Sequence, residues 1–244
     1  MTLRRILLLL LVAAPLGLGG CKEAPGKPKA EVESGRPEQV LDFNVLYKQN
    51  CAACHGESGK NGAAISLANP IYLATAGAPN IQRITASGVP GTMMPAFGKA
   101  AGGPLTDQQI ATLAQGMMTN WGNPGSLGGL APPSYTATSH GDAAQGQKAF
   151  TTYCARCHGA DGSGSTDANR RRIGSLIDPA YLALVSEQGL RSFIIAGQPD
   201  AGMPDWRSDL NGPSLHPMSE QDLADTVAYL EAHRIAAPGQ PYQH

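Results

Sequence analysis

Two copies of a Cys-x-x-Cys-His motif, at residues 51–55 and 154–158, are the residues of this chain best suited to chemistry. Two thiols on one helical turn can reach the two vinyl groups of a haem and form thioethers, and the next imidazole is then held beneath the iron. The motifs therefore predict two covalently bound haem c groups, with His55 and His158 as axial iron ligands. The expected thioether residues are Cys51, Cys54, Cys154 and Cys157.

Two other uses of such cysteine pairs compete with haem attachment. A redox-active Cys-x-x-Cys of the thioredoxin kind follows a strand and does not need the histidine. A four-thiolate zinc site would have to join the two motifs, and it would leave both histidines without a role. Haem attachment is the interpretation that uses every conserved-type position of the motif, and it is the one we carry forward.

The second axial ligand of each iron is expected to be a methionine. Met94 and Met203 both stand before a proline in a Met-Pro-x-aromatic context. A thioether is a soft ligand that raises the reduction potential of haem iron, whereas a buried core methionine is the alternative. Met93 competes with Met94 in the first half, but the position matching Met93 in the second half is Gly202, which cannot ligate.

The two halves of the chain are repeats of one another. Ser66-Leu67-x-Asn69-Pro70 matches Ser175-Leu176-x-Asp178-Pro179 at an offset of 109 residues, and both Met-Pro pairs keep that offset. The two motifs are 103 residues apart, so six extra residues lie in the second half, at 167–172. Each repeat also ends in an expected helix with a capping box, starting at Thr106 and Ser219.

The N-terminus resembles a bacterial export signal with a lipid attachment site. Arg4 and Arg5 precede a short apolar run, and Leu-Gly-Gly-Cys21 follows. The run is too short to span a membrane, so Cys21 is expected to carry lipid; ordinary cleavage beside an unmodified cysteine is the alternative. The expected order is a signal peptide (1–20), lipidated Cys21 and a flexible tether (21–37), a first domain (38–122), a linker (123–139), a second domain (140–236) and a tail (237–244).

Composition favours short helices and long loops. The chain has 30 glycines and 19 prolines, and only 5% of its residues are aromatic. Charged residues make up 15%, and the formal net charge of −1 gives no reason to expect nucleic-acid binding. Before position 140, His55 is the only histidine. The first haem is therefore not expected to have two histidine ligands from its own domain.

These motifs together resemble the small class I bacterial cytochromes c, and the whole chain is similar to a tandem di-haem cytochrome c. The resemblance implies an all-α fold of two tandem domains, each wrapped around one haem. It also implies that the first and last helices of a domain cross closely, with a glycine against an aromatic residue. We therefore expect Tyr229 to pack over Gly146 and, with sizes exchanged, Phe43 over Gly116.

The resemblance implies electron transfer rather than enzymatic catalysis, because two irons with His and Met ligands have no open position. Expected partners are a quinol-oxidising complex, a dehydrogenase or a terminal oxidase, reached from a lipid anchor on the periplasmic side of a bacterial membrane. Two alternatives stay open: a haem subunit of a larger respiratory complex, and a di-haem peroxidase, which needs a vacant axial position. Three arginines at 170–172 are interpreted as a solvated loop, with partner docking or haem propionate pairing as the alternatives.

Overall fold

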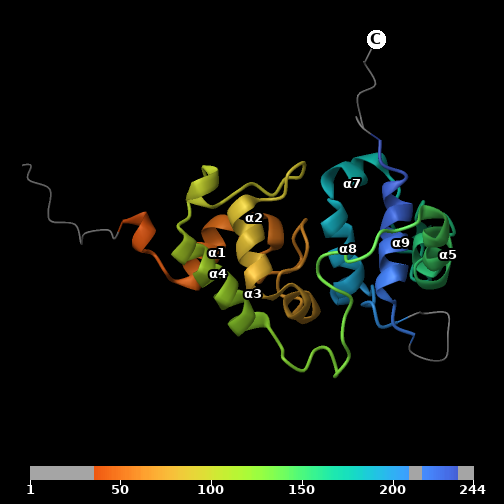
Figure 1. Cartoon of the computed structure of the whole chain (residues 1–244), viewed down its shortest axis with the longest axis horizontal. Helices are drawn as coiled ribbons and strands as arrows, with labels where there is room; N and C mark the ends of the chain where they lie inside the picture. Colours follow the sequence, from red (N-terminus) through yellow and green to blue (C-terminus); the bar gives the residue numbers. More distant parts are fainter. Residues whose placement is uncertain (1–35, 209–215, 236–244) are drawn as a thin grey trace, which may run out of the picture. The chain divides into compact units, whose positions relative to one another are not determined.

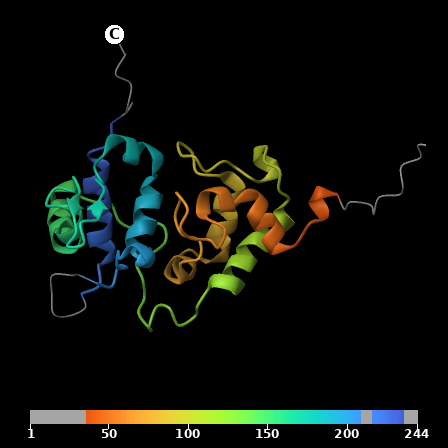
Figure 2. The same cartoon turned by 180° about the vertical axis from the view of Figure 1, so that it is seen from behind.

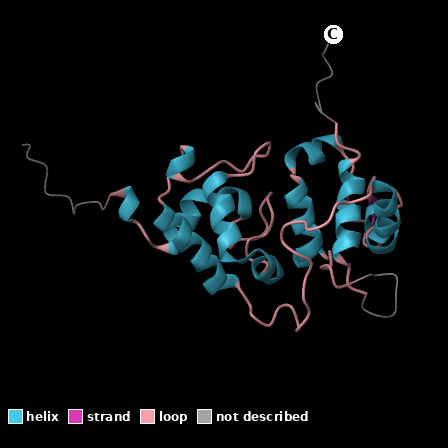
Figure 3. Ribbon diagram, in the orientation of Figure 1, coloured by secondary structure: helices cyan, strands magenta, loops and turns pink. Residues whose placement is uncertain are grey.

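Helices joined by loops make up nearly all the regular structure of this computed structural model, as the colours of Figure 3 show. It describes residues 36–208 and 216–235, so the expected signal peptide and Cys21 lie outside the described residues. The elements of the first repeat are η1 (Pro37–Gln39), α1 (Phe43–Asn50), α2 (Ala52–His55), α3 (Pro70–Ser87), η2 (Lys99–Ala101) and α4 (Asp107–Trp121).

The second repeat follows the same order, with one short hairpin added. Its elements are α5 (Ala143–Tyr153), α6 (Ala155–His158), β1 (Ser165–Thr166), β2 (Arg172–Ile173), α7 (Pro179–Leu184), α8 (Glu187–Ala196), η3 (Pro199–Ala201) and α9 (Glu220–Glu231). The strands β1 and β2 pair antiparallel and flank the six extra residues of this repeat. Apart from this hairpin the described elements are helical, which confirms the expected all-α class.

The long helix of each repeat is interrupted at the same place. In α3, Gly77 has a positive φ of 66° and Pro79 lacks a backbone donor, so the helix is kinked there. In the second repeat the matching position, Ser186, caps the start of α8 by accepting a hydrogen bond from the Gly189 amide, so that α7 and α8 are separate helices. The kinked α3 and the pair α7–α8 are therefore equivalent parts of the two repeats.

Both expected capping boxes are present. The Thr106 hydroxyl accepts from the Gln109 amide and the Gln109 side chain accepts from the Thr106 amide, and Ser219 and Asp222 pair in the same way. Each box satisfies backbone donors at a helix start that would otherwise lack partners. The terminal helices α4 and α9 thus begin where the sequence pattern indicates.

The crossing of first and last helices confirms the size exchange expected from the sequence. A Cβ added to Gly116 would lie 2.2 Å from the Phe43 ring, so Phe43 of α1 rests directly on α4. In the second repeat a Cβ on Gly146 would lie 1.9 Å from the Asp225 carbonyl oxygen and 2.8 Å from Cβ of Tyr229. Figures 1 and 2 show α5 and α9 side by side from opposite directions.

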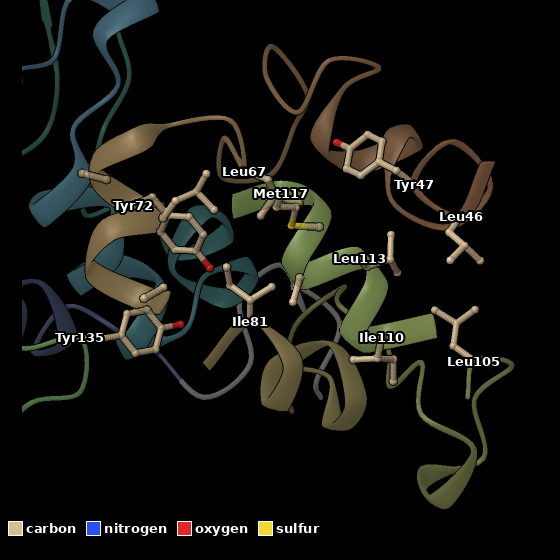
Figure 4. Close-up of a cluster of buried hydrophobic side chains, with 14 residues drawn as sticks. Leu46, Tyr47, Leu67, Tyr72, Ile81, Leu105, Ile110, Leu113, Met117 and Tyr135 are labelled. Atoms are coloured by element: carbon tan, nitrogen blue, oxygen red, sulfur yellow. The ribbon is translucent and has the colours of Figure 1, made fainter. Parts of the chain in front are cut away.

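Each repeat has its own buried core. The core of the first repeat includes residues of α1, α3 and α4, and Figure 4 shows Leu113 and Met117 of α4 among them. The core of the second repeat centres on Phe150 and Leu223, which are fully buried. Tyr47 and Phe150, each four residues before its motif, are both buried, as the sequence predicts.

The segment at 123–139 joins the repeats and is also bound to both of them. The ring of Tyr135 is buried in the first core, 6.5 Å from the Tyr72 ring centroid, as Figure 4 shows. The guanidinium of Arg191, on α8, donates to the backbone carbonyls of Ser134 and Tyr135. Residues of both repeats therefore hold this connection in place.

A direct contact also links the two repeats. The side chain of Asn69 caps α3 and donates from Nδ2 to the Ala196 carbonyl, at the end of α8, over 2.9 Å. Asn69 is buried. Its counterpart Asp178 caps α7, but a carboxylate has no such donor. The described residues from Pro37 onward form one compact unit. No helix of the described ranges is long and apolar enough to cross a membrane.

Candidate functional site

The second repeat holds a cavity that collects every site residue the sequence predicts for it. The cavity has a volume of about 370 Å³, and Cys154, Cys157, His158 and Met203 all line it. Cys154 ends α5, and the next turn, α6, carries Cys157 and His158. Met203 comes from the loop after η3. The remaining walls include buried apolar side chains such as Phe150 and Leu230.

The first repeat presents its motif on the same local structure. Cys51 ends α1 with φ and ψ of −119° and −36°, and Cys154 ends α5 with −118° and −35°. Cys51 is half-buried, Cys54 is exposed and His55 is buried. Because α2 is a single turn, both thiols and the imidazole lie within one helical turn, as thioether attachment to a haem requires.

The imidazole of His55 is already oriented as an iron ligand. Its Nδ1 lies 2.8 Å from the carbonyl oxygen of Ile65, so Nδ1 carries the proton and donates it there. The lone pair of Nε2 then remains for a metal. Burial lowers the pKa of His55, and the Ile65 carbonyl opposes that shift without reversing it. The neutral form that coordination needs is therefore favoured.

His158 has the matching neighbour in the second repeat. Gly174 stands 109 residues after Ile65, and its carbonyl opposes the lowering of the His158 pKa by burial. Nδ1 of His158 is buried, and no partner within the described residues meets the geometry of a hydrogen bond. The Gly174 carbonyl thus lies near the ring but is not aligned with its N–H. A small rotation of the imidazole, as on metal binding, would complete the same arrangement as in the first repeat.

The two methionine loops have the same backbone path. The amide of Val89 donates to the Met94 carbonyl over 3.0 Å, and the amide of Gln198 donates to the Met203 carbonyl over 3.0 Å. The glycine before each donor has a positive φ, 67° in Gly88 and 64° in Gly197. The backbone therefore pairs Met94, and not Met93, with Met203.

Glycine is required at the start of both loops. A Cβ on Gly88 would lie 2.6 Å from the Pro95 carbonyl carbon, and one on Gly197 would lie 2.6 Å from that of Pro204. A side chain at either position would push the Met-Pro segment away from the helix that precedes it. Met94 is half-buried, while 78% of the Met93 side chain is exposed.

The four cysteines of the motifs are free thiols. Burial raises the pKa of Cys51 to about 11 and that of Cys154 to about 12, and the second thiol of each motif adds to the shift. These thiols are protonated at neutral pH, unlike the low-pKa cysteine of a redox-active pair. The two pairs belong to separate repeats and do not join, and the described residues contain no cluster of three or more His, Cys, Asp or Glu side chains placed to hold a metal ion.

Residues 143–234 match the family model "Cytochrome c", and residues 38–115 match the model "Cytochrome C oxidase, cbb3-type, subunit III". Both halves of this chain are cytochrome c domains. Such domains imply covalently bound haem c. The donor set of the second domain fits that group, since two thiols, an imidazole and a thioether face one cavity and Nδ1 of the imidazole is buried without a partner.

Two curated proteins resemble parts of this tandem cytochrome c. One is the Cbb3-type cytochrome c oxidase subunit CcoP of Azospirillum sp. (strain B510), 29% identical over 60% of this chain and 50% of that protein. The other is the fructose dehydrogenase cytochrome subunit of Gluconobacter japonicus, 34% identical over 41% of this chain and 24% of that protein. The chain thus spans half of the first relative and about a quarter of the second.

Among solved structures, a chain of the reducing HAO-like protein complex of Kuenenia stuttgartiensis is similar to the tandem cytochrome c with a TM-score of 0.42. The two sequences are 16% identical, and the match covers 82% of this chain and 99% of that chain. A likeness of this size does not establish a shared arrangement of the two domains.

Two of the histidines outside the motifs were expected to be exposed. His216 is exposed in its loop, as expected. His233 lies just beyond the end of α9 and not on that helix, and it is half-buried. Its ring packs edge-on against Tyr229, with centroids 5.0 Å apart, and its Nδ1 lies 2.9 Å from the Tyr229 carbonyl. The expectation for His233 was therefore wrong, because the helix ends early enough for the ring to fold back onto Tyr229.

Some residues of the second site carry no local sequence signal. Trp206 and Arg172 both line the cavity, although neither belongs to the Cys-x-x-Cys-His motif or is an axial candidate. Alignment of the two repeats could have singled out Trp206, because Phe97 stands in its place in the first domain. The position of Arg172 depends on how the six extra residues fold.

Proposed function

We propose that this protein is a di-haem electron-transfer cytochrome of a bacterial respiratory chain. The observation that carries the proposal is the cavity of the second domain, where both thiols of the motif, His158 and Met203 meet. Haem iron held between an imidazole and a thioether supplies reversible one-electron chemistry. The same donor types stand on the same backbone path in the first domain, so the proposal extends to a second haem c there.

The residue roles follow from this geometry. Cys51 and Cys54 attach one haem and Cys154 and Cys157 the other. His55 and His158 donate from Nδ1 to a backbone carbonyl and leave Nε2 for the iron, while Met94 and Met203 occupy the opposite face. With both faces of each iron taken by protein ligands, small molecules have no vacant position, so we infer a carrier and not a peroxidase.

The contacts between the two domains support passage of electrons within one chain. Asn69 of the first domain bonds to the end of α8, and the Gly197 turn that follows leads directly into the Met203 loop. Arg191 holds the connecting segment against the second domain. Because these contacts are buried, we propose that the two haem sites keep one relative arrangement and exchange electrons inside the molecule.

We further propose that the chain is exported and held by lipid at Cys21 on the periplasmic side of a bacterial membrane. The export signal and lipid attachment sequence support this part. Donors and acceptors are then redox proteins at the same membrane, such as a quinol-oxidising complex, a dehydrogenase or a terminal oxidase. A second candidate is a haem subunit of a larger complex, favoured by the names of the two relatives, which are subunits of an oxidase and of a dehydrogenase.

Mass spectrometry of the intact exported protein tests the proposal. The expected mass carries two covalent haem groups. The double variant C51A/C54A and the double variant C154A/C157A should each lose one of them. A wild-type chain with a single haem, or a pair of variants that both keep two, would overturn the assignment. Co-purification of other subunits after mild detergent extraction would favour the complex subunit over a free carrier.

A further inference from the structure

Phe97 and Trp206 occupy the same place in the two cytochrome c domains, but only the second can donate a hydrogen bond. Both stand three residues after the methionine ligand candidate. The Phe97 carbonyl accepts from the Leu105 amide over 2.8 Å, and the Trp206 carbonyl accepts from the Met218 amide over 2.8 Å. With the backbone role preserved, the difference between the two domains at this place is the indole N–H.

The indole nitrogen of Trp206 has no acceptor among the described residues. Trp206 is 4% exposed and lines the cavity, and its Nε1 is buried without a hydrogen-bond partner. An indole nitrogen can only donate, and a buried donor without an acceptor costs about 1–3 kcal/mol. An acceptor supplied by the occupant of the cavity would remove this cost.

The six extra residues of the second domain fold against the same cavity. Within this loop the Asp167 carboxylate accepts from the Asn169 and Arg171 amides and from Arg171 Nε. Arg171 also donates from Nη2 to the Ala201 carbonyl over 2.8 Å, which holds the loop against η3, directly before Met203. Asp167 thus shapes the loop, and Arg171 fastens it to the segment that carries the methionine.

This fold places the cation of Arg172 at the cavity. Arg172 lines the cavity, and its side chain makes no ion pair within the described residues. The acids that also line it are paired: Asp205 with Arg207 at 2.6 Å, and Asp167 with Arg171 at 3.2 Å. The unpaired charge contributed by these residues is therefore positive.

We propose that Trp206 and Arg172 form a carboxylate site in the second domain that binds a propionate of its haem. A carboxylate accepts from both an indole N–H and a guanidinium, and this is the chemistry that the two unpartnered donors require. The first domain has Phe97 in place of Trp206 and lacks the inserted loop, so it does not have this site. The inference rests on the proposed haem in the second domain.

The site makes the two haems unequal. A negative carboxylate near the iron favours the oxidised state, and a guanidinium and an indole N–H bound to it offset that charge. Removal of either donor should therefore lower the reduction potential of the second haem. The first haem should not respond, because Phe97 offers no donor.

Redox titration of W206F and R172Q in the full haem-loaded protein tests the proposal. W206F installs the residue that the first domain has at this place. Each variant should lower the reduction equilibrium constant of the same one haem by about threefold or more, the scale of a weakened charge-assisted hydrogen bond. The propionate bending bands of one haem in the resonance Raman spectrum should shift, a change that a merely structural role would not cause.

The matched control is R170Q, which removes one charge from the same loop at a residue that does not line the cavity. It should leave both potentials in place, whereas R172K should restore part of the loss. Unchanged potentials and Raman bands in both W206F and R172Q, with two haems still bound, would overturn this site alone. An equal response to R170Q and R172Q would also overturn it, because a general charge effect would then explain the shift. A wild-type protein without a second haem would instead contradict the proposed function.

Discussion

Arg191 and Glu220 form an ion pair of 2.5 Å between α8 and the start of α9, and only 3% of the Arg191 side chain is exposed. The pair also binds the connecting segment, since Arg191 donates to the Ser134 carbonyl and Glu220 accepts from the Ser134 and Thr138 amides. A segment with the composition of a loose linker is thus held by a buried charge. This contact underlies the proposed constant arrangement of the two haem sites.

Replacement of Arg191 should release this segment. R191M leaves the Glu220 carboxylate and two backbone carbonyls without their donor, and should lower the free energy of unfolding by about 2–3 kcal/mol. Chemical denaturation measures the loss, and limited proteolysis should show new cleavage within 123–139. The control K148A removes an exposed cation and should change neither; equal effects of the two variants would argue against the role of Arg191.

The same pair predicts a response to acid. Burial alone would raise the pKa of Glu220, but the bonds from Thr138, Arg191 and Ser134 outweigh it and hold that pKa below its ordinary value of 4.5. A carboxyl group whose pKa is lowered by folding stabilises the protein above its unfolded pKa, and this is lost as the pH falls through the folded value. Stability should therefore decline below about pH 4.5, and less steeply in E220Q. Identical pH profiles for E220Q and wild type would contradict this role.

The two helix crossings should respond differently to an added methyl group. G116A pushes against the Phe43 ring and should cost roughly 1–3 kcal/mol of stability. The double variant G116A/F43L should recover part of that loss, because the smaller side chain makes room. G146A pushes against the Asp225 carbonyl oxygen, so Y229L should not rescue it. Urea unfolding of these variants measures each effect; a rescue by Y229L equal to that by F43L would contradict the described packing.

The repeat register explains why these crossings could be predicted from the sequence. Helix periodicity and capping boxes place α4 and α9, and close packing then requires that a large residue on one helix meets a small one on the other. The role of the Arg191–Glu220 pair could not be predicted in this way. It joins residues 29 apart to a connecting segment farther back in the chain, and no local spacing records such a contact.

The site shows the same division. The offset of 109 residues selects Met94, and the matching loop hydrogen bonds agree with that choice. The orphaned Nε1 of Trp206 and the fold of the inserted loop became apparent only in three dimensions. Burial and pairing of polar atoms depend on distant chain segments, which a motif does not contain.

The choice between Met93 and Met94 gives a direct test at the first haem. M94A should remove an axial ligand, so carbon monoxide should bind one haem of the reduced protein rapidly and the potential of that haem should fall. M93A removes a mostly exposed side chain and should behave like wild type. Visible spectra during carbon monoxide titration make the comparison. Rapid binding in M93A but not in M94A would reverse the assignment.

The most direct test of the whole account is a spectroscopic redox titration of the native protein in its membranes, with carbon monoxide added to the reduced form. The account predicts two c-type haems per chain, each reduced in a one-electron step, each with the iron–sulfur charge-transfer band when oxidised, and neither binding carbon monoxide rapidly. A single haem per chain, or a resting five-coordinate iron that binds carbon monoxide at once, would contradict it.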